Sequence, residues 1–409
     1  MTYIDLFAGA GGLSEGFINE RFHPIAHVEM NEESCNTLKS RVAFHYLSKN
    51  HNLKIYNAYL KKEISRDDLW ASIPAQLINS VICKEISEVT IEGIFKKIES
   101  QNSYKNVDVL VGGPPCQAYS IAGRSRDPNG MKGDKRNFLF RYYAKFLNQY
   151  KPKYFLFENV MGLLTAGNAK YFNAMCKMFT EIGYSVDYKV LNAADYGVLQ
   201  KRKRVFIIGR KGNLKFKFPE LDITENNWQT KRDLFVDLPH LQPGQEMDIV
   251  KYTKPVNEYL MLTGARRNID FTTQHITRNH NERDLKIYSL VIDKWLNQKH
   301  RLRYDEIPKS LQTHSNTKSF LDRYKVIDPN GLSHTIVAHI AKDGHYYIYP
   351  DPRQIRSISV REAARLQSFA DDYYFEGGRT SAFRQIGNAV PPLMAQKIAK
   401  SIKHLLDND

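Results

Sequence analysis

Cys116 lies in the stretch GGPPCQAYS, residues 112–120, directly after two glycines and two prolines. The apolar run before it, residues 107–111, predicts a short buried strand, and the glycines and prolines predict a turn out of that strand. Reactive side chains of open α/β sheets lie at the carboxyl ends of strands. Free cysteines are also among the most buried residue types. The local pattern therefore leaves two interpretations open, a structural thiol or a nucleophile.

Two further segments place charged side chains at the ends of strand patterns. FLFENV (155–160) is an apolar run that ends on Glu158, where burial would favour a general acid; a solvated or capping glutamate is the alternative. In QKRKRVFIIG (200–209), Arg202 and Arg204 stand two residues apart, which predicts that both side chains point to the same face. Two guanidinium groups there could hold a phosphate and a base carbonyl, or simply face water.

A glycine-rich turn predicts a cofactor site. DLFAGAGGLSEGF (5–17) lies between a strand pattern and a helix pattern, and Gly9, Gly11 and Gly12 permit a tight turn and close approach of a ligand. Glu29 ends the next strand, near the spacing at which a carboxylate binds ribose hydroxyls. This order favours an adenosine-containing cofactor over a plain glycine turn. Because the pattern is GxGG and not GxGxxG, a nicotinamide cofactor is less favoured.

Strand and helix patterns alternate along the first half of the chain. Strands are predicted at 2–7, 24–29, 79–83, 107–111, 153–159, 184–191 and 204–209, and helices near 13–20, 31–42, 138–149 and 169–182. The alternation predicts an α/β fold with a mostly parallel sheet and helices on both faces. Residues 211 to about 345 are polar and irregular, which is typical of a second, smaller domain. Near the end, Met394, Ile398, Ile402 and Leu405 predict one apolar face of a helix that packs back on the first domain.

Composition and charge narrow the class of protein. The 409 residues carry a net charge of +15, and two windows, 124–153 and 189–217, each hold nine Lys or Arg against two and one acidic residues. Such clusters favour a polyanionic partner over two merely solvated faces. The four cysteines are widely spaced, so neither a metal site nor a disulfide framework is expected. The absence of a long apolar run or a leader pattern predicts a cytoplasmic protein.

The ordered motifs together resemble the DNA (cytosine-5) methyltransferases of the bacterial restriction-modification type. DLFAGAGGLSEGF, GGPPCQAYS, ENV, QKRKR, REAARLQSF and GNAVPPLMA follow the order of that family's motifs and cover about 1–210 and 355–409. The resemblance implies the Rossmann-like fold of S-adenosylmethionine-dependent methyltransferases, with a seven-stranded sheet. It also implies a catalytic domain at 1–210, completed by 355–409, and a target-recognition domain at 211–354.

The resemblance assigns roles to individual residues. It implies that Cys116 attacks C6 of a flipped-out cytosine, that Glu158 shares a proton with ring N3, that Arg204 lies near O2 and that Arg202 holds a backbone phosphate. Its cofactor pocket maps to Phe7, Gly9, Gly11, Leu13, Glu29, Leu139, Asn388 and Ala389. Two positions depart from the family pattern: Glu85 stands for its usual aspartate and Met30 for an aromatic residue. DNA contacts are expected at Gln117, Ser120, Arg124 and Gln200, and no metal is expected.

The same residues also bear on three other possible functions. An RNA cytosine-5 methyltransferase acting on tRNA shares the fold, but the long segment 211–345 favours double-stranded DNA containing a short specific sequence. A Rossmann-type oxidoreductase leaves Cys116 and the paired arginines without a role, and an inactive DNA-binding relative would be expected to lose Cys116 or Glu158. The short N-terminus suits a bacterial or phage enzyme that protects DNA from a companion restriction endonuclease encoded nearby, although an orphan methylase would look the same. A monomer is expected, because action on one base needs no symmetry. No recognition sequence can be named.

Overall fold

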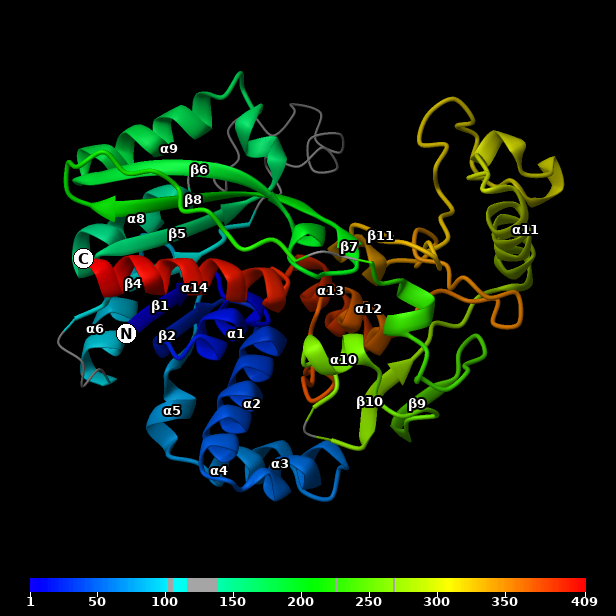
Figure 1. Cartoon of the computed structure of the whole chain (residues 1–409), viewed down its shortest axis with the longest axis horizontal. Coiled ribbons are helices and arrows are strands. Elements are labelled where there is room, and N and C mark those ends of the chain that lie inside the picture. The colour runs from blue at the N-terminus through cyan, green and yellow to red at the C-terminus, as the bar shows by residue number, and fades with distance from the viewer. Residues whose placement is uncertain (102–105, 116–138, 225–226, 268) are drawn as a thin grey trace.

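The centre of the protein is a seven-stranded sheet in the order β3-β2-β1-β4-β5-β8-β6 (Figure 1). The computed structural model describes residues 1–101, 106–115, 139–224, 227–267 and 269–409. The strands are β1 (Thr2–Leu6), β2 (His23–Glu29), β3 (Val81–Cys83), β4 (Val109–Gly112), β5 (Tyr154–Asn159), β6 (Tyr184–Asn192) and β8 (Lys203–Lys211). All seven lie within two residues of their predicted bounds. Only β8 runs antiparallel to its neighbours, so the mostly parallel sheet is confirmed.

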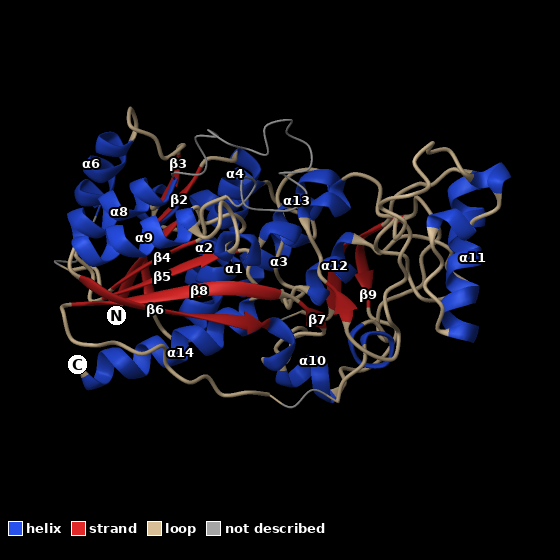
Figure 2. Cartoon of the chain, turned by 90° about the horizontal axis from the view of Figure 1, so that it is seen from above, coloured by secondary structure: helices blue, strands red, loops and turns tan. Residues whose placement is uncertain are grey.

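Helices cover both faces of this sheet (Figure 2). One face packs against α6 (Ile91–Gln101), α8 (Leu139–Tyr150) and α9 (Lys170–Glu181), and the other against α1 (Gly12–Asn19) and α14 (Pro392–Asn408). Helix α2 (Glu32–Lys49) follows β2 and is joined to β3 by three short helices, α3 (Leu53–Leu60), α4 (Arg66–Ala71) and α5 (Ala75–Asn79). The α/β architecture with two covered faces is confirmed by this packing. No helix in the described part of the chain is long and apolar enough to cross a membrane.

The C-terminal helix returns to the first strands, as its apolar spacing predicts. Met394, Ile398 and Ile402 of α14 are buried against the sheet. A side chain at Gly16 of α1 would collide with the backbone of Ala395, so this glycine permits the two helices to lie in close contact. The red α14 therefore runs beside the blue N-terminal elements in Figure 1.

The segment after β8 is less irregular than the sequence predicts. It contains the antiparallel pair β9 (Glu246–Lys251) and β10 (Phe271–Ile276), the short α10 (Glu258–Leu262), and the two-residue strand β11 (Ser333–His334) beside β7 (Gln200–Lys201). It also contains the 17-residue helix α11 (Glu282–Gln298), at the far right of Figure 1. Asn281 caps α11, and Ile287, Val291 and Ile292 are buried on one face. That helical spacing was present in the sequence, so the expectation of an irregular segment was wrong there. The 211–354 domain boundary stays a prediction.

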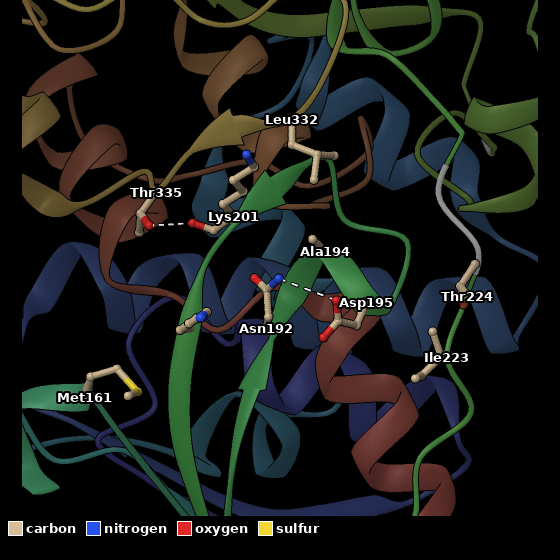
Figure 3. Close-up of a pocket in the computed structure, with 10 residues that line it drawn as sticks. Met161, Asn192, Ala194, Asp195, Lys201, Ile223, Thr224, Leu332 and Thr335 are labelled. Atoms are coloured by element: carbon tan, nitrogen blue, oxygen red, sulfur yellow. Dashed lines mark hydrogen bonds between the residues drawn. The ribbon is translucent and has the colours of Figure 1, made fainter.

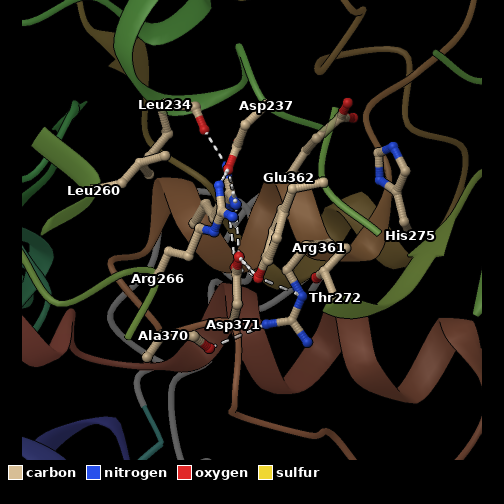
Figure 4. Close-up of polar contacts among 12 residues, drawn as sticks. Leu234, Asp237, Leu260, Arg266, Thr272, His275, Arg361, Glu362, Ala370 and Asp371 are labelled. Atoms are coloured by element: carbon tan, nitrogen blue, oxygen red, sulfur yellow. Dashed lines mark hydrogen bonds and ion pairs between the residues drawn. The ribbon is translucent and has the colours of Figure 1, made fainter. Parts of the chain in front are cut away.

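Buried arginines of α12 (Val360–Leu366), the helix before α13 (Arg379–Asn388), join this segment to the core. From α12, Arg361 donates to the backbone carbonyl of Thr273 in β10 at 3.0 Å. Arg365 donates to both Asp237 and Asp371, each at 2.6 Å. Figure 4 shows these two carboxylates and Arg361. Burial alone would raise the pKa of the Asp371 carboxyl, but the Arg365 guanidinium holds it below its usual range. The REAARLQSF motif thus fastens the segment after β8 to the core.

Replacing Arg365 with methionine is expected to cost about 3–5 kcal/mol of unfolding free energy, because it leaves the buried carboxylates Asp237 and Asp371 without their shared cation. Urea denaturation of the purified variant measures this. Arg303→Met is the matched control: Arg303 and its partner Asp305 are 55% and 36% exposed, so little or no loss is expected. Equal losses in the two variants would contradict a central role for the Arg365 network.

Candidate active site and cofactor pocket

The ends of β4 and β5 form one half of the candidate active site. These strands are parallel neighbours with Gly112 opposite Phe157, so Gly113 lies beside Glu158. A Cβ atom at Gly113 would come within 2.6 Å of the Glu158 Oε2, and glycine therefore allows this carboxylate to lie against the turn. Asn159 Nδ2 donates to the Pro114 carbonyl at 3.3 Å, which ties the same turn to β5. Cys116 follows one residue after the described Pro115 and itself lies outside the described residues.

Glu158 and Arg204 form an ion pair at this edge, with Arg204 Nε 3.1 Å from Glu158 Oε1. The two side chains are 13% and 12% exposed, so both are largely removed from water yet open at one side. Arg204 Nη1 also donates to the Lys203 carbonyl at 2.8 Å, which fixes the guanidinium. Burial raises the pKa of Glu158, and Arg204 and Arg202 offset that effect only in part. The pair can therefore present a protonated carboxyl next to a fixed cation.

Arg202 is interior, which corrects its expected contact with a DNA phosphate. The chain leaves β7 at Lys201 and enters β8 at Lys203, so Arg202 lies at a break between two strands. Its side chain is 1% exposed and donates to the carbonyls of Ile336 at 2.6 Å and Ala389 at 2.9 Å. A guanidinium held in this way cannot reach a DNA phosphate as placed.

Gln200 is also interior, which corrects its expected position at a DNA surface. Its amide nitrogen, Nε2, donates to the Leu366 carbonyl and to Gln367 Oε1, both at 2.9 Å. Its Oε1 accepts from the Ile336 amide at 2.8 Å. Gln200 thus links β7 to α12 and to the chain after β11. The other expected DNA contacts, Gln117, Ser120 and Arg124, lie outside the described residues.

The glycine turn after β1 forms the candidate cofactor pocket. Phe7, Gly9 and Gly11 have φ angles of +55°, +54° and +80°, so the turn needs the left-handed region three times in five residues. A Cβ added to Gly9 would meet no atom within 4 Å, which leaves open space beside that backbone. The Glu29 carboxylate accepts from the amides of Gly9 at 2.8 Å and Met30 at 2.9 Å. Glu29 is therefore held at the mouth of this space.

Asp5 adds a group that the motif comparison missed. It is buried near the end of β1, and its Oδ2 has no hydrogen-bond partner among the described residues. Burial raises the pKa of Asp5 well above its usual value, and the nearby Glu29 raises it further. An unpartnered carboxyl beside an open glycine backbone and a second carboxylate suits a ligand that carries positive charge and hydroxyl groups. The one acidic residue in the apolar run YIDLF was the available signal.

The remaining predicted pocket residues differ in how far they are exposed. Met30 and Glu85 are exposed near the adjoining ends of β2 and β3, where the Lys84 amide donates to the Glu29 carbonyl at 2.8 Å. Asn388 is exposed at the end of α13, whereas Ala389 is buried and its carbonyl is engaged by Arg202. Phe7 and Leu139 are half-buried. Leu13 is buried on α1, in the core that it shares with residues of α14.

Comparisons with known proteins agree with this geometry. The family model described as C-5 cytosine-specific DNA methylase matches residues 1–78 and 75–404. The type II methyltransferase M.Bpa9945I of Bacillus paralicheniformis is 39% identical over 445 aligned residues, which span 100% of this chain and 99% of that protein. M1.HphI of Haemophilus parahaemolyticus, also a type II methyltransferase, is 31% identical over 100% of this chain and 88% of its own length.

A solved structure shares the fold. The crystal structure of a protein described as a prophage-encoded DNA modification methyltransferase (E. coli) superposes with a TM-score of 0.65 at 24% identity, covering 100% of this chain and 99% of the other. At that identity the likeness concerns the fold alone. The family model and the relatives carry the assignment: the chain belongs to the C-5 cytosine-specific DNA methylases and is a DNA (cytosine-5) methyltransferase of the restriction-modification type.

Proposed function

We propose that this enzyme methylates C5 of a cytosine that it flips out of a short specific sequence in double-stranded DNA, through a covalent adduct with Cys116. The observation that carries the proposal is the Glu158–Arg204 pair, which lies against Gly113 in the turn that leads to Cys116. A base inside a stacked duplex cannot reach a strand end, so the target nucleotide must leave the helix.

The chemistry needs a nucleophile, an acid and a base. The Cys116 thiolate adds to C6 of the cytosine, and Glu158 donates a proton to N3 so that C5 becomes nucleophilic. Arg204 binds O2 and keeps Glu158 in place. After methyl transfer a base removes the C5 proton, and the electron pair of that bond re-forms the C5–C6 double bond and expels the Cys116 thiolate. N3 then returns its proton to Glu158. Arg202 and Gln200 act as positioning residues, because they hold the start of β8 from the interior.

Methylases of this family use S-adenosylmethionine, and we propose that the glycine turn binds it. When bound, S-adenosylmethionine supplies an electrophilic methyl group on a sulfonium ion. Glu29 would bind the ribose hydroxyls, and the open backbone at Gly9 would admit the ligand. The unpartnered Asp5 carboxyl would face its positive charge. Phe7, Gly11, Met30, Glu85, Leu139, Asn388 and Ala389 complete the proposed pocket.

Gly9→Ala is expected to weaken S-adenosylmethionine binding at least about tenfold, because the new methyl group enters the open space beside the turn. Titration calorimetry measures the dissociation constant. Gly212→Ala is the matched control: Gly212 also has a positive φ, +110°, and a Cβ there would likewise meet nothing within 4 Å. Both variants carry backbone strain of about 1 kcal/mol, so Gly212→Ala should lose stability but keep wild-type binding. Equal affinity in the two variants would contradict the placement of the pocket.

Base-resolution mapping of 5-methylcytosine in DNA from cells that express this chain tests the reaction. Methylation of one short sequence, absent from cells that express Cys116→Ala, is the expected result. 5-Methylcytosine found in tRNA and not in DNA would instead favour the RNA methyltransferase alternative.

We further propose that the enzyme acts as a monomer in the cytoplasm, where bacterial DNA lies, and that a companion endonuclease cuts the unmethylated sequence. Co-transformation with genes adjacent to the coding sequence tests that last point.

A further inference from the structure

Two cysteines that are far apart in the sequence lie together beside the candidate cofactor pocket. Cys83 ends β3 and lies opposite Glu29 of β2 in the parallel register. Cys35, near the start of α2, donates its thiol to the Glu29 carbonyl at 3.4 Å. The Lys84 amide donates to the same carbonyl at 2.8 Å. One oxygen atom therefore holds both of the segments that carry these cysteines.

The side chains of the two cysteines face each other. Because side chains alternate along a strand, Cys83 points to the same face of β3 as Val81, two residues earlier. Val81 packs in one buried cluster with Cys35 and Leu38 of α2. Burial raises the pKa of the Cys35 thiol, and a hydrogen bond with the Cys83 thiol raises it further. Both cysteines are free thiols in this structure.

The two thiols differ in exposure, and this gives them different reactivity. Cys83 is exposed, whereas Cys35 is fully buried. The raised pKa keeps the Cys35 thiol protonated near neutral pH, so it is a poor first nucleophile toward a dissolved oxidant. Cys83 is open to such an oxidant. An exposed thiol with a second thiol in contact is the arrangement found in reversible redox sensors.

We propose that Cys83 and Cys35 form a reversible disulfide when the enzyme meets a peroxide. The Cys83 sulfur attacks one peroxide oxygen, the O–O bond breaks, and the released hydroxide takes the thiol proton to give water. Cys83 is then a sulfenic acid, oxidised by two electrons, and the peroxide is reduced. Cys35 attacks that sulfur, so that an S–S bond forms and the S–O bond breaks. The departing hydroxide takes the Cys35 proton as a second water, and a thiol reductant restores both thiols.

The disulfide changes the edge of the cofactor pocket, a consequence that rests on the proposed function. An S–S bond is about 2.05 Å long, so the two sulfurs must move together from a non-bonded contact. The bond also consumes the Cys35 proton that is donated to the Glu29 carbonyl. Glu29 lies opposite Cys83, and Glu85 follows it by two residues. Oxidation is therefore expected to lower the affinity for S-adenosylmethionine about tenfold, the loss that follows when one charged hydrogen bond is misplaced.

Hydrogen peroxide treatment of the full-length Cys116→Ala variant tests the proposal in a background without the proposed nucleophile. Mass spectrometry of an unreduced digest should find the Cys35 and Cys83 peptides joined, and two hydrogens lighter than the two free peptides together. Calorimetry should then show the loss of affinity for S-adenosylmethionine, and dithiothreitol should restore it. Adding Cys83→Ser should abolish both effects of peroxide. Adding Cys176→Ser, the matched control, should leave both unchanged.

Oxidation of methionine is distinguished in the same experiment. Met30, directly after Glu29, is exposed, and so is Met161, which lies outside the proposed pocket and lines the groove of about 730 Å³ in Figure 3. The digest reports sulfoxide at both methionines. Dithiothreitol reduces a disulfide but leaves methionine sulfoxide, so only a loss of affinity that it reverses supports the proposal.

Three outcomes would overturn the proposal: no linked peptides, an unchanged affinity in the linked protein, or a loss of affinity that persists in the Cys83→Ser variant. Failure of the reduced protein to bind S-adenosylmethionine would contradict the proposed function instead. The two failures are distinguishable, because the masses of the peptides report the disulfide whether or not the cofactor binds.

Discussion

Cys116→Ala is expected to abolish methyl transfer while the protein still folds and binds DNA. The substitution removes the thiolate that makes C5 nucleophilic, and loss of a covalent nucleophile lowers a rate constant by about 10⁴-fold or more. Transfer of a tritium-labelled methyl group to a duplex that carries the mapped sequence measures the rate. A duplex with fluorine at C5 of the target cytosine gives a second readout. It offers no C5 proton for removal, so the wild-type enzyme should remain covalently attached and Cys116→Ala should not.

Cys176→Ala is the matched control for this experiment. Cys176 lies in α9, away from the strand ends, and burial raises the pKa of its thiol to about 11, so it is protonated near neutral pH. It should therefore be a poor nucleophile, and its alanine variant should keep wild-type activity. Covalent trapping of Cys116→Ala on the fluorinated duplex would contradict the assignment of Cys116 as the nucleophile. It would indicate that another side chain forms the adduct.

The features that the sequence predicts correctly are those set by short stretches of chain. Each of the seven sheet strands is an apolar run bounded by turn residues, and the turn at GGPP follows β4 as the local pattern requires. Glu158 was placed at a strand end for the same reason. The match of ordered motifs then supplied the family, since six motifs in sequence are far more specific than any one of them.

The features that were missed depend on contacts between distant segments. Arg202 was expected at a DNA phosphate, but β7 pairs with β11, more than 130 residues later, and the Arg202 side chain is buried. The carbonyl of Ile336 that then receives the Arg202 guanidinium lies in the segment after β11. No periodicity within QKRKR carries that information. Asp5 was missed for a related reason, because its burial depends on the elements that pack around β1.

Glu158→Gln is expected to lower the methylation rate constant by about 10²–10⁴-fold, the range for removal of a general acid. Glutamine keeps an oxygen that can accept from Arg204 Nε, so the ion-pair geometry should persist while the proton donor is lost. Glu181→Gln, an exposed glutamate at the end of α9, is the matched control and should be indistinguishable from the wild type. A full wild-type rate in Glu158→Gln would exclude proton donation by this residue.

The pH dependence separates proton donation from a merely structural role of Glu158. Burial raises the pKa of Glu158, and its protonated fraction falls as pH rises through that value. The wild-type rate constant should therefore fall on the alkaline side. The Cys116 thiolate acts in the opposite direction and limits the rate at low pH, which predicts a bell-shaped profile. Glu158→Gln should lack the alkaline limb.

The raised pKa of Glu158 also makes the stability of the folded enzyme depend on pH. A carboxyl whose pKa is higher in the folded than in the unfolded state favours folding below the unfolded value and loses that contribution as pH rises through the folded value. Ionised Glu158 is thus a cost to the folded enzyme at alkaline pH, and Glu158→Gln should be at least as stable as the wild type there. A variant that is inactive, stable and without the alkaline limb would identify Glu158 as the proton donor; an unstable variant that keeps this limb would contradict that role.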